Sequence, residues 1–273
     1  MSFEGRVALI TGGSRGIGRS LALKLAERGT TPIINYRQND DAAAETVARI
    51  ERLGRSGVAI RADLESVDEI EAMFDQVAER FGKLDFFVSN ASASAFRSFM
   101  ELKPHHLERT WNLNVRAFVL GTQRAVELMP SGGRIVALSS YGSIRHFPTY
   151  SNLGSAKAAI EAWTRSMAVE LAPRGINVNA VNGGIIESDS SSYFYSTGRV
   201  PPLETVVPKI PKQRMGTVDE VADCVVFLLA PESEYVTGTT LIVDGGLTAV
   251  APPFPSDAPA LAEVGAHDAD ESA

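Results

Sequence analysis

The sequence predicts an α/β fold in which a doubly wound parallel sheet is covered by helices on both faces. Short β-branched runs alternate with amphipathic helical patterns along nearly the whole chain, as repeated strand–helix–strand units do. A glycine-rich turn follows the first strand-like run. The 273 residues are 44% hydrophobic and 22% charged, which is ordinary for a globular protein. Because parallel crossovers are right-handed, these units favour a doubly wound arrangement in a single domain.

Seven runs rich in β-branched residues are the expected strands, and in chain order they cover residues 6–11, 31–36, 58–61, 84–89, 134–139, 177–181 and 239–243. Between the strands, apolar residues recur every three to four positions, as over 40–53 and 66–81, which predicts amphipathic helices. We expect these elements to form one domain over residues 1–250.

Two segments depart from this rhythm. The connection 188–215 carries the aromatic cluster Tyr193, Phe194 and Tyr195, and a connection that long inside a compact domain usually closes over a ligand. The tail 251–273 is rich in alanine, proline and acidic residues, so we expect it to be disordered.

Charge and composition exclude several classes of partner. The chain has 26 basic and 33 acidic residues, a net charge of −7, and no clustered basic stripe, so no nucleic-acid partner is expected. No apolar run approaches the roughly 20 residues that span a bilayer, so we expect a cytoplasmic protein with no membrane partner. Cys224 is the single cysteine and is expected in the core. His105 and His106 are adjacent and cannot easily face one site, so no metal is assigned.

The glycine-rich turn GGSRGIG lies between the first strand and the first helix, which is where a Rossmann fold binds the phosphates of a dinucleotide. One glycine permits the tight turn, the next lets the backbone approach a pyrophosphate, and the third lets helix and strand pack closely. The free N–H groups of the helix N-terminus then face the phosphates. The expected cofactor contacts in this turn are Gly12, Ser14, Arg15, Gly16, Ile17 and Gly18.

Cofactor type is predicted by the end of the second strand. An NAD-binding protein usually places a carboxylate there, but this strand ends with Tyr36 and Arg37, and no carboxylate occurs before Asp40. Arg15 projects from the glycine turn toward the same corner. Two guanidinium groups suit a 2′-phosphate, which favours NADPH. The alternative is that Arg37 is a solvated loop residue.

At these segments the sequence resembles the short-chain dehydrogenase/reductase family. The matching motifs are TGGSRGIG, RADL, SNAS, NLNVRA, ALSS, SAKAAIEA and VTGTTLIVDGG, which together run from about residue 5 to 246. The resemblance implies that Asp63 contacts adenine, with Leu64 beside it, and that Asn90 and Ala91 flank the cofactor. Ser92 replaces the glycine usual in that turn. Further cofactor contacts implied by the family are Lys157, Gly184, Ile186 and Ser188.

The family's catalytic pattern is altered here. Ser140 lies seventeen residues before Lys157, as expected, but Leu153 occupies the position of the usual tyrosine, four residues before the lysine. The nearest upstream tyrosine is Tyr150, seven residues before Lys157. This spacing, together with Gly183 followed by Gly184, resembles the NADPH-dependent enoyl-[acyl-carrier-protein] reductase III type.

The displaced tyrosine suits the chemistry of an enoyl thioester. Hydride delivered to the β-carbon develops charge on the thioester oxygen, further from the nicotinamide than a ketone oxygen would be, so the hydroxyl donor must move outward. Tyr150 is expected to hydrogen-bond that oxygen and supply a proton, Lys157 to hold the nicotinamide ribose and favour charge on the tyrosine, and Ser140 and Asn114 to support them.

We therefore expect NADPH-dependent reduction of the 2,3 double bond of an enoyl thioester, carried on acyl-carrier protein or CoA, in fatty-acid or secondary-metabolite biosynthesis. Two alternatives stay open: a 3-oxoacyl thioester or carbonyl reductase, and a non-catalytic cofactor-binding subunit. The resemblance also implies a homotetramer or dimer built through two long helices near 114–129 and 151–172.

Overall fold

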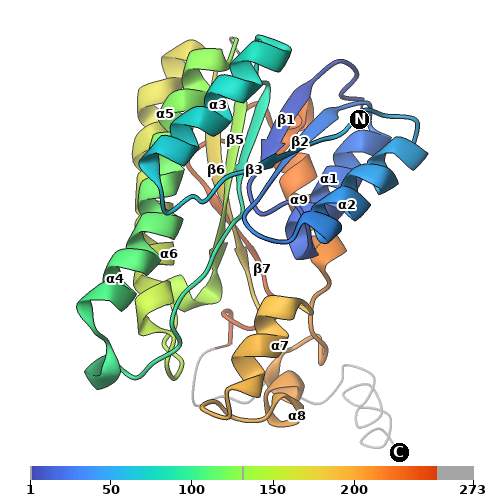
Figure 1. The fold of residues 1–273 in the computed structure, drawn as a ribbon. Helices are drawn as coiled ribbons and strands as arrows, with labels where there is room; N and C mark the ends of the chain where they lie inside the picture. The colour runs from blue at the N-terminus through green and yellow to red at the C-terminus, as the bar shows by residue number, and fades with distance from the viewer. Residues whose placement is uncertain (1, 131, 251–273) are drawn as a thin grey trace, which may run out of the picture.

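The computed structural model describes residues 2–130 and 132–250, and within them seven parallel strands form one sheet in the order β3-β2-β1-β4-β5-β6-β7 (Figure 1). The strands are β1 (Val7–Ile10), β2 (Thr31–Tyr36), β3 (Val58–Arg61), β4 (Phe86–Ser89), β5 (Arg134–Ser140), β6 (Asn177–Gly183) and β7 (Thr240–Val243). This order reverses direction between β1 and β4, which confirms the predicted doubly wound sheet.

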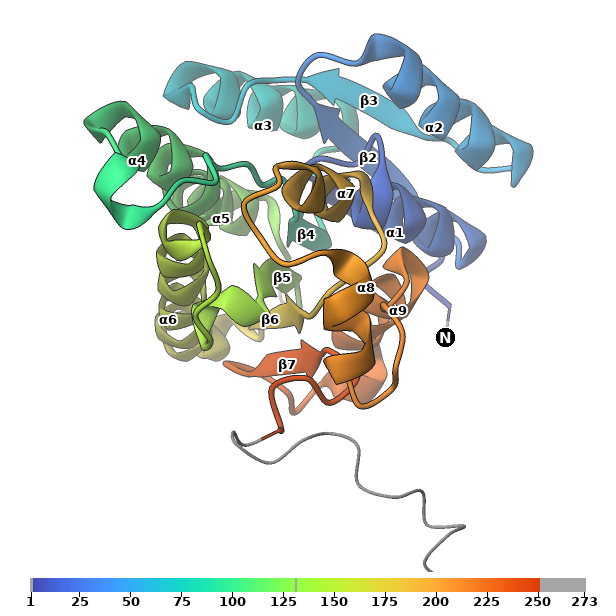
Figure 2. The same ribbon diagram turned by 90° about the horizontal axis from the view of Figure 1, so that it is seen from below.

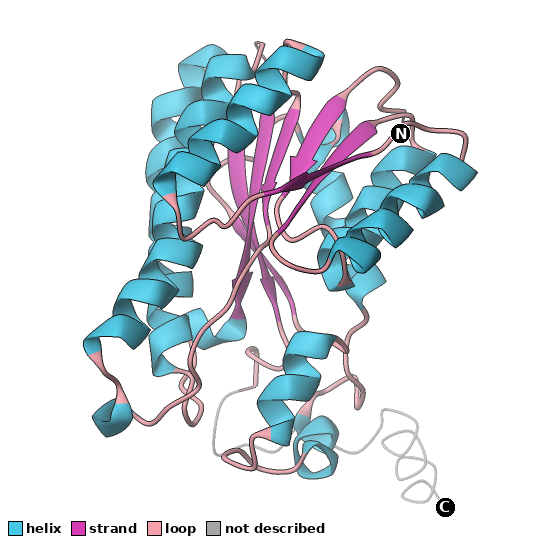
Figure 3. Ribbon diagram, viewed as in Figure 1, coloured by secondary structure: helices cyan, strands magenta, loops and turns pink. Residues whose placement is uncertain are grey.

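Helices cover both faces of the sheet, as the view coloured by secondary structure shows (Figure 3). The α-helices are α1 (Gly16–Glu27), α2 (Asp40–Arg52), α3 (Val67–Phe81), α4 (Pro104–Trp111), α5 (Ala117–Leu128), α6 (Ser151–Leu171), α7 (Asp189–Ser196), α8 (Leu203–Val206) and α9 (Val218–Leu229). No helix among these described residues combines the length and apolar character needed to cross a bilayer.

The core is divided into two layers by the sheet, because successive strand residues point to opposite faces. Leu9 belongs to the layer packed with α3, α5 and α6, whereas its neighbours Ala8 and Ile10 belong to the layer packed with α1, α2 and α9. All three side chains are 0% exposed. Burying an aliphatic side chain of the size of Leu9 stabilises the fold by about 1.5–3 kcal/mol, so the continuous apolar runs of the central strands define the sheet.

Several helix starts follow from local capping. Ser66 accepts a hydrogen bond from the Glu69 N–H and so lies just before α3, and Asn39 caps α2 in the same way through the Ala42 N–H. The strand expected over 177–181 continues to Gly183, because it pairs with β5 along its whole length.

The connection expected as a loop over 188–215 is largely helical. It contains α7, α8 and a short 3-10 turn, Val207–Lys209, which lie beyond the carboxyl ends of the central strands (Figures 1 and 2). Ser188 lies directly before α7 and caps it, because its hydroxyl accepts from the Ser191 N–H. The tail 251–273, expected to be disordered, lies outside the described residues.

Candidate active site

The glycine turn joins β1 to α1 at the point where the strand order reverses, which is where doubly wound sheets bind ligands. Gly12 and Gly16 have φ of 64° and 55°, in the left-handed region that favours glycine. A Cβ on Gly18 would lie 2.4 Å from the Gly12 carbonyl oxygen, so helix and strand could not approach as they do. Gly12 and Gly16 are therefore favoured by backbone conformation and Gly18 by the close approach of helix and strand.

Asn90 fastens this turn to the end of β4. Its side-chain amide donates to the Thr11 carbonyl at 2.8 Å and to the Gly12 carbonyl at 3.2 Å. The Thr11 hydroxyl in turn accepts from the backbone N–H groups of Asn90 and Ala91. The residues placed beside the cofactor by the sequence motif thus hold the turn in shape through buried hydrogen bonds.

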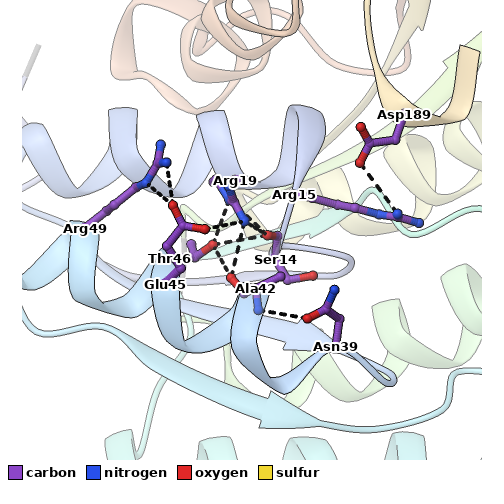
Figure 4. A network of polar contacts seen from close by, with 9 residues as sticks. All are labelled: Ser14, Arg15, Arg19, Asn39, Ala42, Glu45, Thr46, Arg49 and Asp189. Carbon is purple, nitrogen blue, oxygen red and sulfur yellow. Dashed lines mark hydrogen bonds and ion pairs between the residues drawn. The ribbon is translucent and has the colours of Figure 1, made fainter. Parts of the chain in front are cut away.

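Open space lies in front of Gly16, where an added Cβ would meet no atom within 4 Å. Behind it the turn is rigid: the Ser14 carbonyl accepts from Arg19 and Thr46, which come from α1 and α2 (Figure 4). Ile17 packs against the apolar layer on that face. A rigid turn with exposed N–H groups at a helix N-terminus forms a cradle for phosphate.

Both arginines expected at the ribose corner are held by carboxylates. Arg15 lies 3.5 Å from Asp189, the first residue of α7 (Figure 4). Arg37 lies 3.1 Å from Glu65 and 3.8 Å from Asp63. Both arginine side chains are at least one-third exposed, so each ion pair contributes little to the stability of the fold. Another anion can therefore replace the carboxylate partner of either arginine.

Asp63 shapes the turn after β3. Its carboxylate accepts from the Glu65 N–H at 3.0 Å, and its own N–H donates to Glu69 at 2.7 Å. Leu64 is buried between these polar residues, with 5% of its surface exposed. The half-buried Asp63 side chain remains at the edge of the ribose corner, where the family places its adenine contact.

Tyr150 is the residue before α6, and the structure brings its hydroxyl to 3.0 Å from the Ser140 hydroxyl. Thr149 adopts φ of 63°, a strained value for a β-branched residue, and this turns the chain into the helix. Gly142 allows the ring to lie close, since a Cβ there would be 2.4 Å from it. Burial raises the pKa of Tyr150 to about 12, and the Ser140 hydrogen bond offsets part of that rise. Tyr150 is therefore a protonated donor at neutral pH.

Lys157 lies seven residues after Tyr150, about two turns along α6, with 5% of its surface exposed. Its ammonium donates to the Leu138 carbonyl at 2.8 Å. Burial lowers its pKa to about 8, while the negative charge of Glu161 acts in the opposite direction. Among the described residues no hydrogen bond joins Lys157 to Tyr150. The expected effect of Lys157, which was to favour negative charge on Tyr150, therefore has no direct contact behind it.

Asn114 lies in a π-helical turn, Asn112–Arg116, that precedes α5. Its amide accepts from Ser92 at 2.7 Å and donates to the Ala93 carbonyl at 3.0 Å and the Thr110 carbonyl at 2.8 Å. The serine that replaces the usual glycine thus becomes a partner of Asn114. The contacts assign Asn114 to shaping the segment after β4.

An aromatic cluster surrounds the Tyr150 ring. Phe96 stacks on it with ring centroids 5.7 Å apart, Phe147 packs against it in a tilted arrangement at 4.0 Å, and Phe194 from α7 meets it edge-on at 5.6 Å. The cluster continues to Tyr141, whose ring stacks on Phe147 at 4.6 Å. A recess of about 250 Å³ beside Tyr150 extends along the turn 142–147. Sequence reasoning singled out Phe194 but missed Phe96 and Phe147, which lie in loops without periodic pattern.

The remaining cofactor positions follow β6. Gly184 lies against Asp244, and a Cβ added to Gly184 would be 2.6 Å from the Asp244 Cβ, so only glycine fits. Ile186 is buried and pairs with Gly216 across the connection. Ser188 serves as the cap of α7. Together these residues fix the start of α7 beside the glycine turn.

Comparisons with known proteins agree with this geometry. Residues 12–248 match the family described as Enoyl-(Acyl carrier protein) reductase. The chain is 58% identical to 1-cyclohexenylcarbonyl-CoA reductase of Streptomyces collinus over 253 residues, 93% of this chain and 90% of the relative.

Solved structures share the same fold. A short-chain dehydrogenase from Burkholderia cenocepacia in complex with NADP superposes with a TM-score of 0.84 at 35% identity, covering 91% of this chain and 100% of the other. A blue fluorescent protein from a metagenomic library, in complex with NADPH, gives a TM-score of 0.84 at 32% identity over 90% and 99% of the two chains.

Proposed function

The chain belongs to the enoyl-(acyl carrier protein) reductase family of short-chain dehydrogenases/reductases, and from that premise we propose that it reduces the 2,3 double bond of an enoyl thioester with NADPH. The observation that carries the proposal is the hydroxyl pair of Tyr150 and Ser140, 3.0 Å apart, in a chain whose usual tyrosine position holds the buried Leu153. The relative that is 58% identical, a CoA-thioester reductase by name, supports the same reaction.

The residues present fit NADPH. The open space at Gly16 beside the α1 N-terminus suits the pyrophosphate, and the exchangeable ion pairs of Arg15 and Arg37 offer two guanidinium groups to a 2′-phosphate. Lys157 would hold the nicotinamide ribose. When bound, NADPH supplies the hydride that saturates the β-carbon.

Tyr150 and Ser140 act on the other end of the conjugated system. The Tyr150 hydroxyl donates a hydrogen bond to the thioester oxygen, where negative charge develops, and the Ser140 hydroxyl keeps the Tyr150 proton directed there. Because the pKa of Tyr150 is raised to about 12, the donor is fully protonated at neutral pH. The Tyr150 proton passes to the enolate oxygen, the enol converts to the saturated thioester, and a proton from water restores the Tyr150 hydroxyl.

We further propose that the acyl group is cyclic or branched and is carried on CoA. The aromatic rings of Phe96, Phe147 and Phe194 surround the Tyr150 ring, and such an apolar setting suits a compact hydrocarbon ring next to the Tyr150 hydroxyl. The 1-cyclohexenylcarbonyl-CoA named for the Streptomyces collinus relative is such a substrate. Arg145 and His146, which line the recess at the same turn, are placed to meet a phosphorylated carrier.

The test is NADPH oxidation measured in parallel with 1-cyclohexenylcarbonyl-CoA, crotonyl-CoA and acetoacetyl-CoA. The expected order is cyclic enoyl first, linear enoyl second and ketone last. Faster reduction of acetoacetyl-CoA would favour the carbonyl-reductase alternative, and no oxidation with any thioester would favour the non-catalytic one.

We also propose that the chain assembles as a homotetramer or dimer. Trp111 on α4 and Trp163 and Val169 on α6 are 49%, 41% and 76% exposed, and such large exposed apolar side chains are the kind that a second copy covers. Sedimentation of the purified protein tests this, and a monomer at micromolar concentration would overturn it.

A further inference from the structure

A buried carboxylate lies beside the site and takes no part in the roles described above. Glu161 is 8% exposed and is four residues after Lys157 on α6, so both side chains leave the same face of the helix. Buried acidic residues are rare unless they are paired and hydrogen-bonded, because desolvation penalises the charge. A buried Glu161 therefore needs hydrogen-bond partners that compensate for the loss of water around its carboxylate.

Those partners come from three different elements. One oxygen of Glu161 accepts from the Ser139 hydroxyl at 2.6 Å, the Ser143 hydroxyl at 2.7 Å and the Asn182 amide at 2.8 Å. Ser139 lies on β5 and Asn182 lies opposite it on β6. Ser143 closes the 3-10 turn Tyr141–Ser143, which begins directly after Ser140.

This arrangement joins α6, the helix that carries Lys157, to the turn that directly follows Ser140. We propose that Glu161 is a positioning residue that fixes the Tyr141–Ser143 turn against β5 and β6 and places its charge one helical turn from Lys157. The inference rests on the proposed function, since it assigns a supporting role in that reaction. Glu161 touches neither substrate nor cofactor and acts through Lys157 and Ser143.

Within the described part of the chain, the charge of Glu161 faces no competing charge near Lys157. Most titratable groups on elements packed against α6 contact other partners: Tyr141 contacts Tyr195, Arg134 pairs with Glu234, Arg116 donates to the Glu65 carbonyl, Arg174 to the Val126 carbonyl, and Arg109 pairs with Glu65. On α4, His105 and Glu108 are exposed, and the ring of the half-exposed His106 accepts from the Lys103 N–H. On α6 itself, Arg165 and Glu170 are exposed. Burial lowers the pKa of Lys157 and Glu161 raises it, so removing the carboxylate leaves only the lowering effect.

The test is the substitution Glu161→Gln, which keeps an accepting oxygen and removes the charge. NMR of the lysine Cε and Nζ nuclei in the protein without cofactor should show the pKa of Lys157 falling by about one unit, as expected for loss of a nearby opposite charge. The alkaline limb of kcat/KM should move to lower pH by the same amount. Glu170→Gln, an exposed carboxylate of the same helix, should leave both unchanged.

Ser143→Ala separates the two parts of the proposal, because it removes a hydrogen bond to Glu161 and no charge. It should lower kcat without moving the pKa of Lys157. If Glu161→Gln does not fold, the same question can be tested in the wild-type protein. The NMR chemical shift of the Glu161 carboxyl carbon should then show an inflection at the pH where Lys157 loses its proton. A Lys157 titration unchanged in Glu161→Gln, or no such inflection, overturns the inference. Because these titrations need no substrate, a protein inactive on enoyl thioesters would refute the proposed function without deciding this one.

Discussion

Replacing Tyr150 by phenylalanine removes one hydroxyl from the site and little else. The ring keeps its stacking on Phe96 and its tilted contact with Phe147, so the turn before α6 should remain in place. What is lost is the donor 3.0 Å from Ser140, held protonated by its raised pKa of about 12.

The expected magnitude follows from that donor's role. Removing one hydrogen-bond donor to a developing oxyanion slows an enzyme by about 10²–10³-fold, or about 2.7–4 kcal/mol. Ser140 stays and offers a second hydroxyl, which places the expectation near the lower limit of that range. Binding of NADPH should be unchanged. The side chain of Tyr150 contacts Ser140 and the aromatic cluster, whereas the glycine turn lies elsewhere.

The assay is NADPH oxidation with 1-cyclohexenylcarbonyl-CoA under single-turnover conditions, combined with fluorescence titration of NADPH. Tyr235→Phe is the matched control, since Tyr235 is fully exposed and loses the same hydroxyl. Near-normal enoyl reduction by Tyr150→Phe would refute the reasoning, and equal loss in the control would show that the effect is not local.

Three further outcomes are expected. Arg37→Ala should lower kcat/KM for NADPH by about 10-fold or more and leave NADH use nearly unchanged, because a charge-assisted contact is worth about 1.5–3 kcal/mol; steady-state kinetics with both cofactors checks this. Phe194→Ala should raise KM for the cyclic enoyl-CoA more than for crotonyl-CoA, and an unchanged ratio would remove α7 from the acyl site. The wild-type rate should fall as pH rises through about 8, because deprotonation of Lys157 then removes its charge; a flat profile from about pH 7 to 10 would contradict this.

The sequence predicted the sheet and the glycine turn because both depend on local chemistry. The apolar runs of β1 and β2 are buried on both faces, and Gly18 is required by a close approach within one strand–helix unit. Tyr150 lies directly before α6 and Lys157 lies within it, so their spacing in the sequence corresponds to positions along a single helix.

Features that depend on distant segments were not predicted. Phe96 and Phe194 are far apart in sequence but have ring centroids 4.8 Å apart, and no periodic pattern in either segment indicates the other. The partners of Glu161 come from β5, β6 and the turn between β5 and α6, so its role is visible only when these elements are assembled. The helical character of 189–196 was hidden because serine and aromatic residues are weak helix formers.

In the proposed mechanism, the choice between ketone and enoyl chemistry depends on the whole turn before α6 and not on one tyrosine. Leu153 is 6% exposed, so enlarging it to tyrosine would overpack the core around α6 at a cost of about 1–3 kcal/mol. The Tyr150 ring would remain where it is, because Thr149 is held at positive φ and Gly142 leaves room for that ring alone. Moving the hydroxyl back by one helical turn therefore requires changes at Leu153, Tyr150 and Gly142 together. The seven-residue spacing of Tyr150 and Lys157 therefore depends on the backbone around Thr149 and Gly142 as well as on the tyrosine side chain.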